Sequence, residues 1–254
     1  AVGVGDVLLG EVRDGALGNV ADGVELPSIQ SRLLAELKKA GKKIVFVNFS
    51  GSAIALTPES KTCDAILQAW YPGQAGGTAI ANVLFGDYNP AGRLPVTFYR
   101  STKQLPDFED YSMKGRTYRY MTETPLFPFG HGLSYTTFQY GNASLNTSEI
   151  KDGEQVTLTI PVSNTGKYDG EEVVQVYLRH PGDKEGPSHA LRAFKRVAIA
   201  KGATNNVTIP LSKENFEWFD TSTNTMRPIE GDYEILYGGT SELKQLKSIP
   251  VTIK

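Results

Sequence analysis

Residues 70–99, WYPGQAGGTAIANVLFGDYNPAGRLPVTFY, predict the end of one strand, a loop, a helix and a second strand. An apolar run that ends at Trp70 leads into a turn at Pro72-Gly73, and Gly76-Gly77 let the backbone enter a helix with one apolar face. Gly86 is placed to end that helix in the left-handed conformation. The alternation typical of a strand resumes at Leu94, Val96 and Phe98. The stretch therefore predicts a β-α-β unit with a glycine-rich crossover.

The chain before this stretch alternates strands and helices. Residues 6–10 read as a short buried strand, and residues 44–49 are a continuous apolar run typical of a parallel strand covered on both faces. Between them, residues 28–40 place Ile29, Leu33, Leu34 and Leu37 on one face of an amphipathic helix. Residues 65–70 predict a further strand. We therefore expect a layered α/β sandwich domain with a mostly parallel sheet.

The pattern changes twice after residue 99. Residues 100–137 are rich in Tyr, Arg and Pro and are longer than an ordinary connection, which favours a docking segment. From about residue 138 apolar residues alternate with period two, which predicts an all-β, immunoglobulin-like sandwich of about seven strands. Pro161 should make its strand locally an edge or a bulge. We expect two domains, residues 1–137 and 138–254, docked on each other.

Three long motifs resemble the C-terminal half of glycoside hydrolase family 3, in its β-xylosidase and β-glucosidase branch. They are YPGQAGG at 71–77, LFGDYNPAGRLPVT at 84–97 and FPFGHGLSYT at 127–136. The tail resembles the fibronectin type III-like domain that many family members carry, on NTGKYDGEEVVQVY at 164–177, LRAFKRV at 191–197 and GDYEI at 231–235. The resemblance covers nearly the whole chain.

The resemblance implies a hydrolase that removes β-linked xylose or glucose from non-reducing ends with retention of configuration. In this family the nucleophile is an aspartate on a preceding barrel domain, which this chain lacks, and the acid/base is a glutamate in a loop after an early strand. The matching position here is Glu11, directly after the strand at 7–9. The barrel would raise the pKa of this carboxyl group by desolvating it and by bringing the negative charge of the nucleophile close.

The acid/base loop departs from the pattern of the family. It reads GEVRDG at 10–15 and ADGVELP at 21–27, where relatives are expected to have a longer acidic loop and a Gly-Asp-Arg. Asp14 and Asp22 are therefore alternative candidates. The second hypothesis is a non-catalytic module in which a carbohydrate-contacting or assembly surface remains.

Other polar and aromatic candidates have simpler interpretations. The segment at 114–120 could offer sugar hydrogen bonds, but we favour a docking arm in which Arg116 and Arg119 pair with carboxylates of a neighbouring domain. Trp70 and Tyr71 could stack on a sugar, although packing is the simpler explanation, so the substrate-binding residues are not assigned. His131 is expected to hydrogen-bond in a tight turn. We expect no metal and no cofactor.

Composition bounds the remaining classes. The chain has 254 residues, 40% hydrophobic and 21% charged, with a net charge of -2. This is an ordinary globular composition with no nucleic-acid or membrane signal. Cys63 is the one cysteine and is expected to be a small buried hydrophobe. Because the chain begins at Ala1 without Met or a signal peptide, we expect a processed product or a piece of something longer. The expected partners are a β-linked oligosaccharide substrate and the barrel domain, and the sequence does not decide whether the chain forms a homo-oligomer. The resemblance to the family implies an extracellular or periplasmic location.

Overall fold

The chain forms two compact units. The computed structural model describes the backbone of residues 7–11 and, in full, residues 23–151, 154–220 and 222–254. The α/β unit contains the described residues up to Tyr88 together with Val96–Gly115 and Glu123–Phe127. The sandwich unit contains Asn89–Pro95, Arg116–Thr122 and the chain from Pro128 onward. Between residues 88 and 128 the chain passes back and forth between the two units. The single domain boundary near residue 138 therefore stays a prediction.

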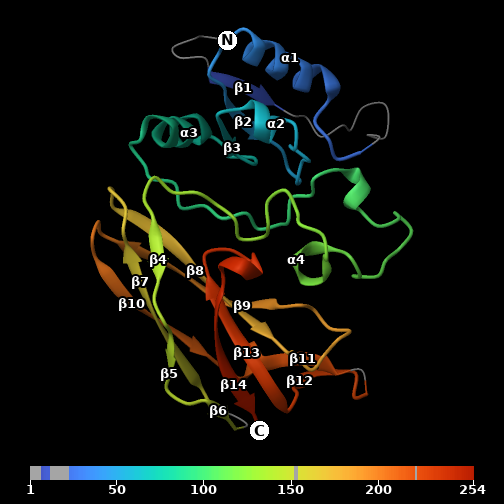
Figure 1. Ribbon diagram of the computed structural model, residues 1–254, viewed down its shortest axis with the longest axis vertical. Coiled ribbons are helices and arrows are strands. Elements are labelled where there is room, and N and C mark those ends of the chain that lie inside the picture. Colours follow the sequence, from blue (N-terminus) through green and yellow to red (C-terminus); the bar gives the residue numbers. More distant parts are fainter. Residues whose placement is uncertain (1–6, 12–22, 152–153, 221) are drawn as a thin grey trace. The chain divides into compact units, whose positions relative to one another are not determined.

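A parallel sheet lies at the centre of the α/β unit (Figure 1). It consists of β1 (Val7–Glu11), β2 (Val45–Phe49) and β3 (Ala65–Gln68), in the order β1-β2-β3. Both neighbouring pairs run parallel. β2 is buried on both faces, as its continuous apolar sequence predicts, with Phe46 and Val47 at most 2% exposed.

Two helices precede and follow β2. α1 (Ser28–Lys39) and α2 (Glu59–Thr62) pack over one sheet face around the buried Leu34, Phe46 and Leu56. Only part of the predicted apolar face of α1 is buried, because Ile29 and Leu33 are 65% and 49% exposed.

The stretch at 70–99 folds as expected in its first half. α3 (Gly76–Phe85) is followed by Gly86 with φ of 86°, the predicted left-handed cap. The strand expected at 94–98 is wrong, because the described backbone there makes only an isolated bridge between Phe98 and Phe127. Pro95 has no N–H to donate, and the Leu94 N–H donates instead to the carbonyl of His131.

The sandwich unit consists of two main sheets and a hairpin (Figure 1). One sheet has the order β10-β7-β4 with β5 also on β7, and the other has the order β6-β14-β13-β8-β9. β11 and β12 form the hairpin. The strands are β4 (Phe138–Tyr140), β5 (Ser144–Leu145), β6 (Glu149–Ile150), β7 (Val156–Asn164), β8 (Gly170–Arg179), β9 (Ala190–Ile199), β10 (Thr204–Leu211), β11 (Glu217–Asp220), β12 (Thr225–Pro228), β13 (Gly231–Gly238) and β14 (Lys247–Ile253).

Short helical turns complete both units. They are η1 (Thr102–Gln104), α4 (Thr117–Tyr120), η2 (Lys213–Phe216) and η3 (Leu243–Gln245).

β7 shows how the sandwich core forms, because every second residue of this strand is buried. Its inward residues, with those of β8, β10, β13 and β14, make one continuous apolar core.

Pro161 lies inside β7, which is paired on both sides. The Pro161 carbonyl accepts the N–H of Gly141, in the gap between β4 and β5, so the proline nitrogen faces that same gap. The carbonyl of Gly141 is taken by the Tyr237 hydroxyl instead, at 3.2 Å. The predicted local edge therefore occurs on one side of β7 only, and the pairing with β10 stays continuous.

The fold class predicted from the sequence, an α/β layer followed by an all-β sandwich, is confirmed. None of the helices among the described residues is long and apolar enough to cross a bilayer.

Candidate active site

The carboxyl ends of the parallel strands meet at one edge of the α/β sheet. Gly10 on β1 lies opposite Asn48 on β2, which lies opposite Gln68 on β3. Glu11 is the last residue of β1, and its backbone lies opposite Phe49. Ligands of open α/β sheets bind outside this kind of edge. The alternative candidates Asp14 and Asp22 lie outside the described residues.

A buried polar cluster lies under this edge. The amide of Asn48 donates to the Ser50 hydroxyl at 3.0 Å and to Gln68 Oε1 at 2.6 Å. The Ser50 hydroxyl donates to the Ser52 carbonyl at 2.9 Å. Asn48 and Ser50 are fully buried, and Asn48 Oδ1 receives no hydrogen bond from the part of the chain that the structure describes. The cluster joins the ends of β2 and β3 and shapes the turn at 50–52.

The backbone reverses sharply just after β3. Trp70 has φ of 54°, which is unusual for a bulky residue and costs about 1–3 kcal/mol. The Trp70 ring meets Phe98 edge-on at 6.1 Å between centroids, and Phe98 is 1% exposed. This aromatic contact anchors the turn. Strand β3 therefore ends at Gln68, two residues before the predicted end.

Tyr71 lies above the turn that follows β2. Its ring is packed so closely on Gly51 that a Cβ added there would lie 2.7 Å from Tyr71 Cε2. Only glycine fits at position 51 without moving the ring. Tyr71 is nevertheless 66% exposed.

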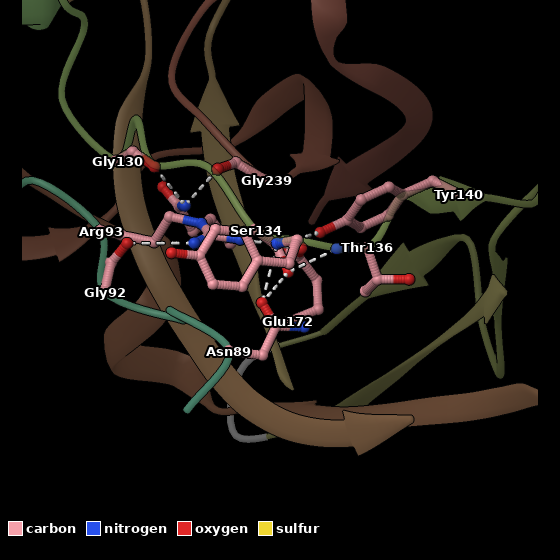
Figure 2. A network of polar contacts seen from close by, with 11 residues as sticks. Asn89, Gly92, Arg93, Gly130, Ser134, Thr136, Tyr140, Glu172 and Gly239 are labelled. Atoms are coloured by element: carbon pink, nitrogen blue, oxygen red, sulfur yellow. Dashed lines mark hydrogen bonds and ion pairs between the residues drawn. The ribbon is translucent and has the colours of Figure 1, made fainter. Parts of the chain in front are cut away.

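The most recognisable motifs build a different place, inside the sandwich unit (Figure 2). Asn89 Oδ1 accepts the Ser134 hydroxyl at 2.9 Å and the Tyr135 N–H at 2.8 Å. The Asn89 amide donates to the carbonyl of Asp169 at 2.9 Å. One side chain therefore joins the motif at 84–97, the motif at 127–136 and the sandwich.

A buried ion pair is the second part of this network. Arg93 binds Glu172 at 2.9 Å, with their side chains 9% and 4% exposed, and the Tyr140 hydroxyl donates to the same carboxylate at 3.1 Å. Burial raises the pKa of Glu172, and the charge of Arg93 opposes that rise. Burial likewise raises the pKa of Tyr140.

Gln175 on β8 is the third part of the network. Its amide donates to the carbonyls of Gly130 and Gly239, at 3.1 and 2.7 Å, and its Oε1 accepts the Tyr177 hydroxyl at 2.5 Å. Gly130 has φ of 77°, and a Cβ there would collide with the Gln175 side chain. The motif side chains of Figure 2 point toward one another, so they hold the segments 89–95 and 128–137 on the sandwich.

The expected docking arm at 114–120 is held through Tyr118. This ring stacks on Phe129 at 4.6 Å, and its hydroxyl oxygen accepts the Leu191 N–H at 3.0 Å. The Ser188 N–H donates to the carbonyl of Arg119 at 2.7 Å. Pairing of Arg116 and Arg119 with carboxylates of another domain stays a prediction.

The sequence carried no signal for the buried His189. Its Nε2 lies 2.9 Å from the Ser241 carbonyl, so this nitrogen carries the proton, and its Nδ1 accepts the Ser188 hydroxyl at 2.8 Å. Burial lowers the pKa of His189 to about 4. This histidine is therefore neutral near pH 7 and serves the packing of the arm.

His131 is the histidine for which the sequence predicted a hydrogen bond in a tight turn. Its backbone N–H donates to the carbonyl of Pro128 at 3.1 Å and closes a turn, and burial lowers the pKa of its ring. Across the described ranges, no group of three or more His, Cys, Asp and Glu side chains converges in a way that could hold a metal ion.

Comparison with known families gives two matches. The model of the glycosyl hydrolase family 3 C-terminal domain matches residues 5–135, and that of the fibronectin type III-like domain matches residues 172–241.

Individual relatives point the same way. A xylan 1,4-β-xylosidase of Xylanibacter ruminicola is 53% identical over 240 residues, 94% of this chain and 28% of the relative. A periplasmic β-glucosidase of Salmonella typhimurium is 37% identical over 78% of this chain and 28% of its own length. The solved β-glucosidase of Erythrobacter marinus has a TM-score of 0.83 and 33% identity, over 98% of this chain and 34% of that structure. The chain thus spans 28% to 34% of these proteins.

Proposed function

Because the chain belongs to glycosyl hydrolase family 3, we propose that it is the C-terminal portion of a retaining exo-β-glycosidase. This enzyme would release β-linked xylose or glucose from non-reducing ends. The similarity to a xylan 1,4-β-xylosidase at 53% identity, over 94% of the chain, carries the proposal and favours xylose. The rest of the active site would come from a barrel domain with an aspartate nucleophile.

Glu11 is the proposed general acid/base. The end of β1 at the carboxyl edge of the sheet supports this role, because loops at such an edge face ligands. In a retaining glycosidase the two carboxyl groups lie about 5 Å apart. Glu11 would protonate the leaving oxygen while the aspartate attacks the anomeric carbon, and would then deprotonate the water that releases the sugar.

This division of labour predicts that the chain alone has no useful turnover. Without a nucleophile, protonation of the leaving oxygen leaves the glycosyl cation unstabilised. The proposed location is extracellular or periplasmic, supported by the similarity to the periplasmic β-glucosidase of Salmonella typhimurium.

The test is hydrolysis of aryl β-xylosides and β-glucosides by the chain alone and mixed with a family 3 barrel domain. We expect activity only in the mixture. Glu11→Gln should lower kcat/KM for phenyl glycosides by about 10²–10⁴ and that for dinitrophenyl glycosides much less, because a good leaving group needs no proton.

Asp14→Asn and Asp22→Asn are the matched controls, and neither should show this dependence on the leaving group. If one of them does and Glu11→Gln does not, the acid/base is misassigned. A folded mixture that hydrolyses none of these glycosides would favour the non-catalytic module.

A further inference from the structure

We propose that Tyr71 is an aromatic platform for the sugar on the leaving-group side of the cleaved bond. This proposal rests on the proposed function and names a binding residue for it.

The first support is the position of Tyr71 along the sheet. Glu11 lies opposite Phe49 on β2, and the Ala69 N–H donates to the Asn48 carbonyl at 2.9 Å, so all three strands end at nearly the same level. Neighbouring strands are about 4.8 Å apart, which separates the ends of β1 and β3 by about 10 Å. Tyr71 follows the end of β3 and is thus within about two sugar lengths of the acid/base strand.

The second support is the way the ring is held. Gly51 lies against the Cε2, Cζ and hydroxyl side of the ring, and the left-handed Trp70 fixes the backbone just before it. The cluster of Asn48, Ser50 and Gln68 in turn holds the Gly51 turn. The ring is therefore fixed in advance while it stays 66% exposed, so binding a ligand there costs little ordering entropy.

The third support is the chemistry of the ligand. In a β-linked xylose or glucose the ring substituents are equatorial, so both faces of the sugar carry C–H groups. Such a face packs on an aromatic ring, whose face is electron-rich and apolar. The acid/base protonates the oxygen that stays with the leaving sugar, and that sugar is therefore held beside the strand of Glu11.

The experiment uses the chain mixed with the barrel domain and compares two substrates. Xylobiose carries a sugar in its leaving group, whereas β-xylosyl fluoride does not; cellobiose and β-glucosyl fluoride replace them if glucosides are preferred. Tyr71→Ala should lower kcat/KM for the disaccharide about tenfold, mainly through KM, and change that for the fluoride less than twofold. Tyr71→Phe should keep both values.

Tyr111→Ala is the matched control, because Tyr111 is an exposed tyrosine of the same unit, at 90%. It should leave both substrates unchanged. Equal losses on both substrates after Tyr71→Ala, or a weaker association with the barrel, would mean that Tyr71 docks protein, and the platform would be rejected. An unchanged KM for the disaccharide would reject it as well.

A binding measurement separates this proposal from the proposed function. The chain with 3-fluorotyrosine is titrated with xylobiose and cellobiose, and the ¹⁹F resonance that disappears in Tyr71→Phe is followed. A mixture that is inactive while this resonance shifts on titration would reject the proposed reaction and keep the sugar site. A resonance that stays unshifted in the chain and in the mixture would reject the platform, whatever the activity.

Discussion

The sandwich unit and the α/β unit differ in how much they bury and in what their polar residues do. Of the described residues, eighteen apolar side chains form one buried cluster in the sandwich, against six in the α/β unit. The sandwich also contains a buried polar network on Asn89, Arg93 and Glu172. The polar cluster of the α/β unit instead lies at the carboxyl edge of its sheet, where Asn48 and Ser50 are buried and Tyr71 is exposed.

This difference teaches that much of the family signature lies away from the proposed acid/base, because parts of the motifs at 84–97 and 127–136 belong to the sandwich unit. The motif at 71–77, which begins with Tyr71, lies in the α/β unit. The motif residues Asn89, Arg93 and Gly130 hold connecting segments on the sandwich. The proposed acid/base Glu11 lies outside those motifs, on the sheet of the α/β unit. A strong motif match is thus evidence of ancestry and stability, and the reaction has to be argued from the sheet edge.

The two units can be followed separately, because each contains one of the two tryptophans of the chain. Trp70 belongs to the α/β unit and Trp218 to the sandwich unit. Trp70→Phe and Trp218→Phe backgrounds therefore leave one reporter each for urea unfolding.

The largest effect is expected from Glu172→Ala. This change leaves the buried guanidinium of Arg93 without its counter-charge, and we expect a loss of about 3–5 kcal/mol in the free energy of unfolding. The measurement is the Trp218 fluorescence transition in urea.

The adjacent Glu171→Ala is the control for this loss. Glu171 pairs with Arg196 at the surface, with side chains 35% and 50% exposed, so the cost should stay within about 1 kcal/mol. Equal effects of the two substitutions would show that the buried pair does not hold the sandwich.

A second prediction breaks the smaller core. Leu34 on α1 is 1% exposed, and Leu34→Ala should cost about 2–5 kcal/mol in the transition reported by Trp70. Leu33→Ala should cost less than about 0.5 kcal/mol, because Leu33 is 49% exposed. Should the Trp218 transition move as much as the Trp70 transition, the units would unfold as one.

The third prediction concerns pH and the sandwich. The folded pKa of His189 is lowered to about 4, first by burial, against about 6.5 in the unfolded chain. The unfolded state therefore binds more protons between these values. This contribution is fully present above pH 6.5 and is lost on acidification to about pH 4, a change of about 3 kcal/mol.

The Trp218 transition in urea, measured from pH 7 to pH 4, tests this prediction. His189→Gln keeps a donor for the Ser241 carbonyl and should flatten the profile in that window. A variant with the same slope as the parent would assign the pH dependence to other groups.

The last prediction concerns the alkylation rate of the Cys63 thiol and involves no change in stability. This thiol packs beside the α/β core, and burial followed by the charges of Glu59 and Asp64 raises its pKa to about 11. Alkylation by iodoacetamide at pH 8 should be on the order of a hundredfold slower than in urea, because the thiolate reacts. A native rate equal to the rate in urea would mean that the α/β core does not protect this thiol.

Local patterns predicted those elements whose stability comes from near neighbours. The helix at 28–40, the buried strand at 44–49 and the cap at Gly86 follow from period, composition and backbone freedom. The alternation from residue 156 likewise predicted the inward face of β7. In contrast, the alternation at 94–98 was misleading, because Leu94 pairs with the segment at 130–131 and Pro95 cannot extend a ladder.

By itself, the sequence determined that an α/β unit precedes an all-β sandwich unit, because this order depends on the periodicity of apolar residues. It also determined the family to which the motifs belong, because the motifs are continuous runs of residues. Only the tertiary structure decided what those residues touch. It paired Arg93 with Glu172, placed Tyr118 on Phe129 and buried His189, because these contacts join residues far apart in the chain. It also fixed Tyr71 on Gly51, since the approach of two strand ends in a parallel sheet is set by register.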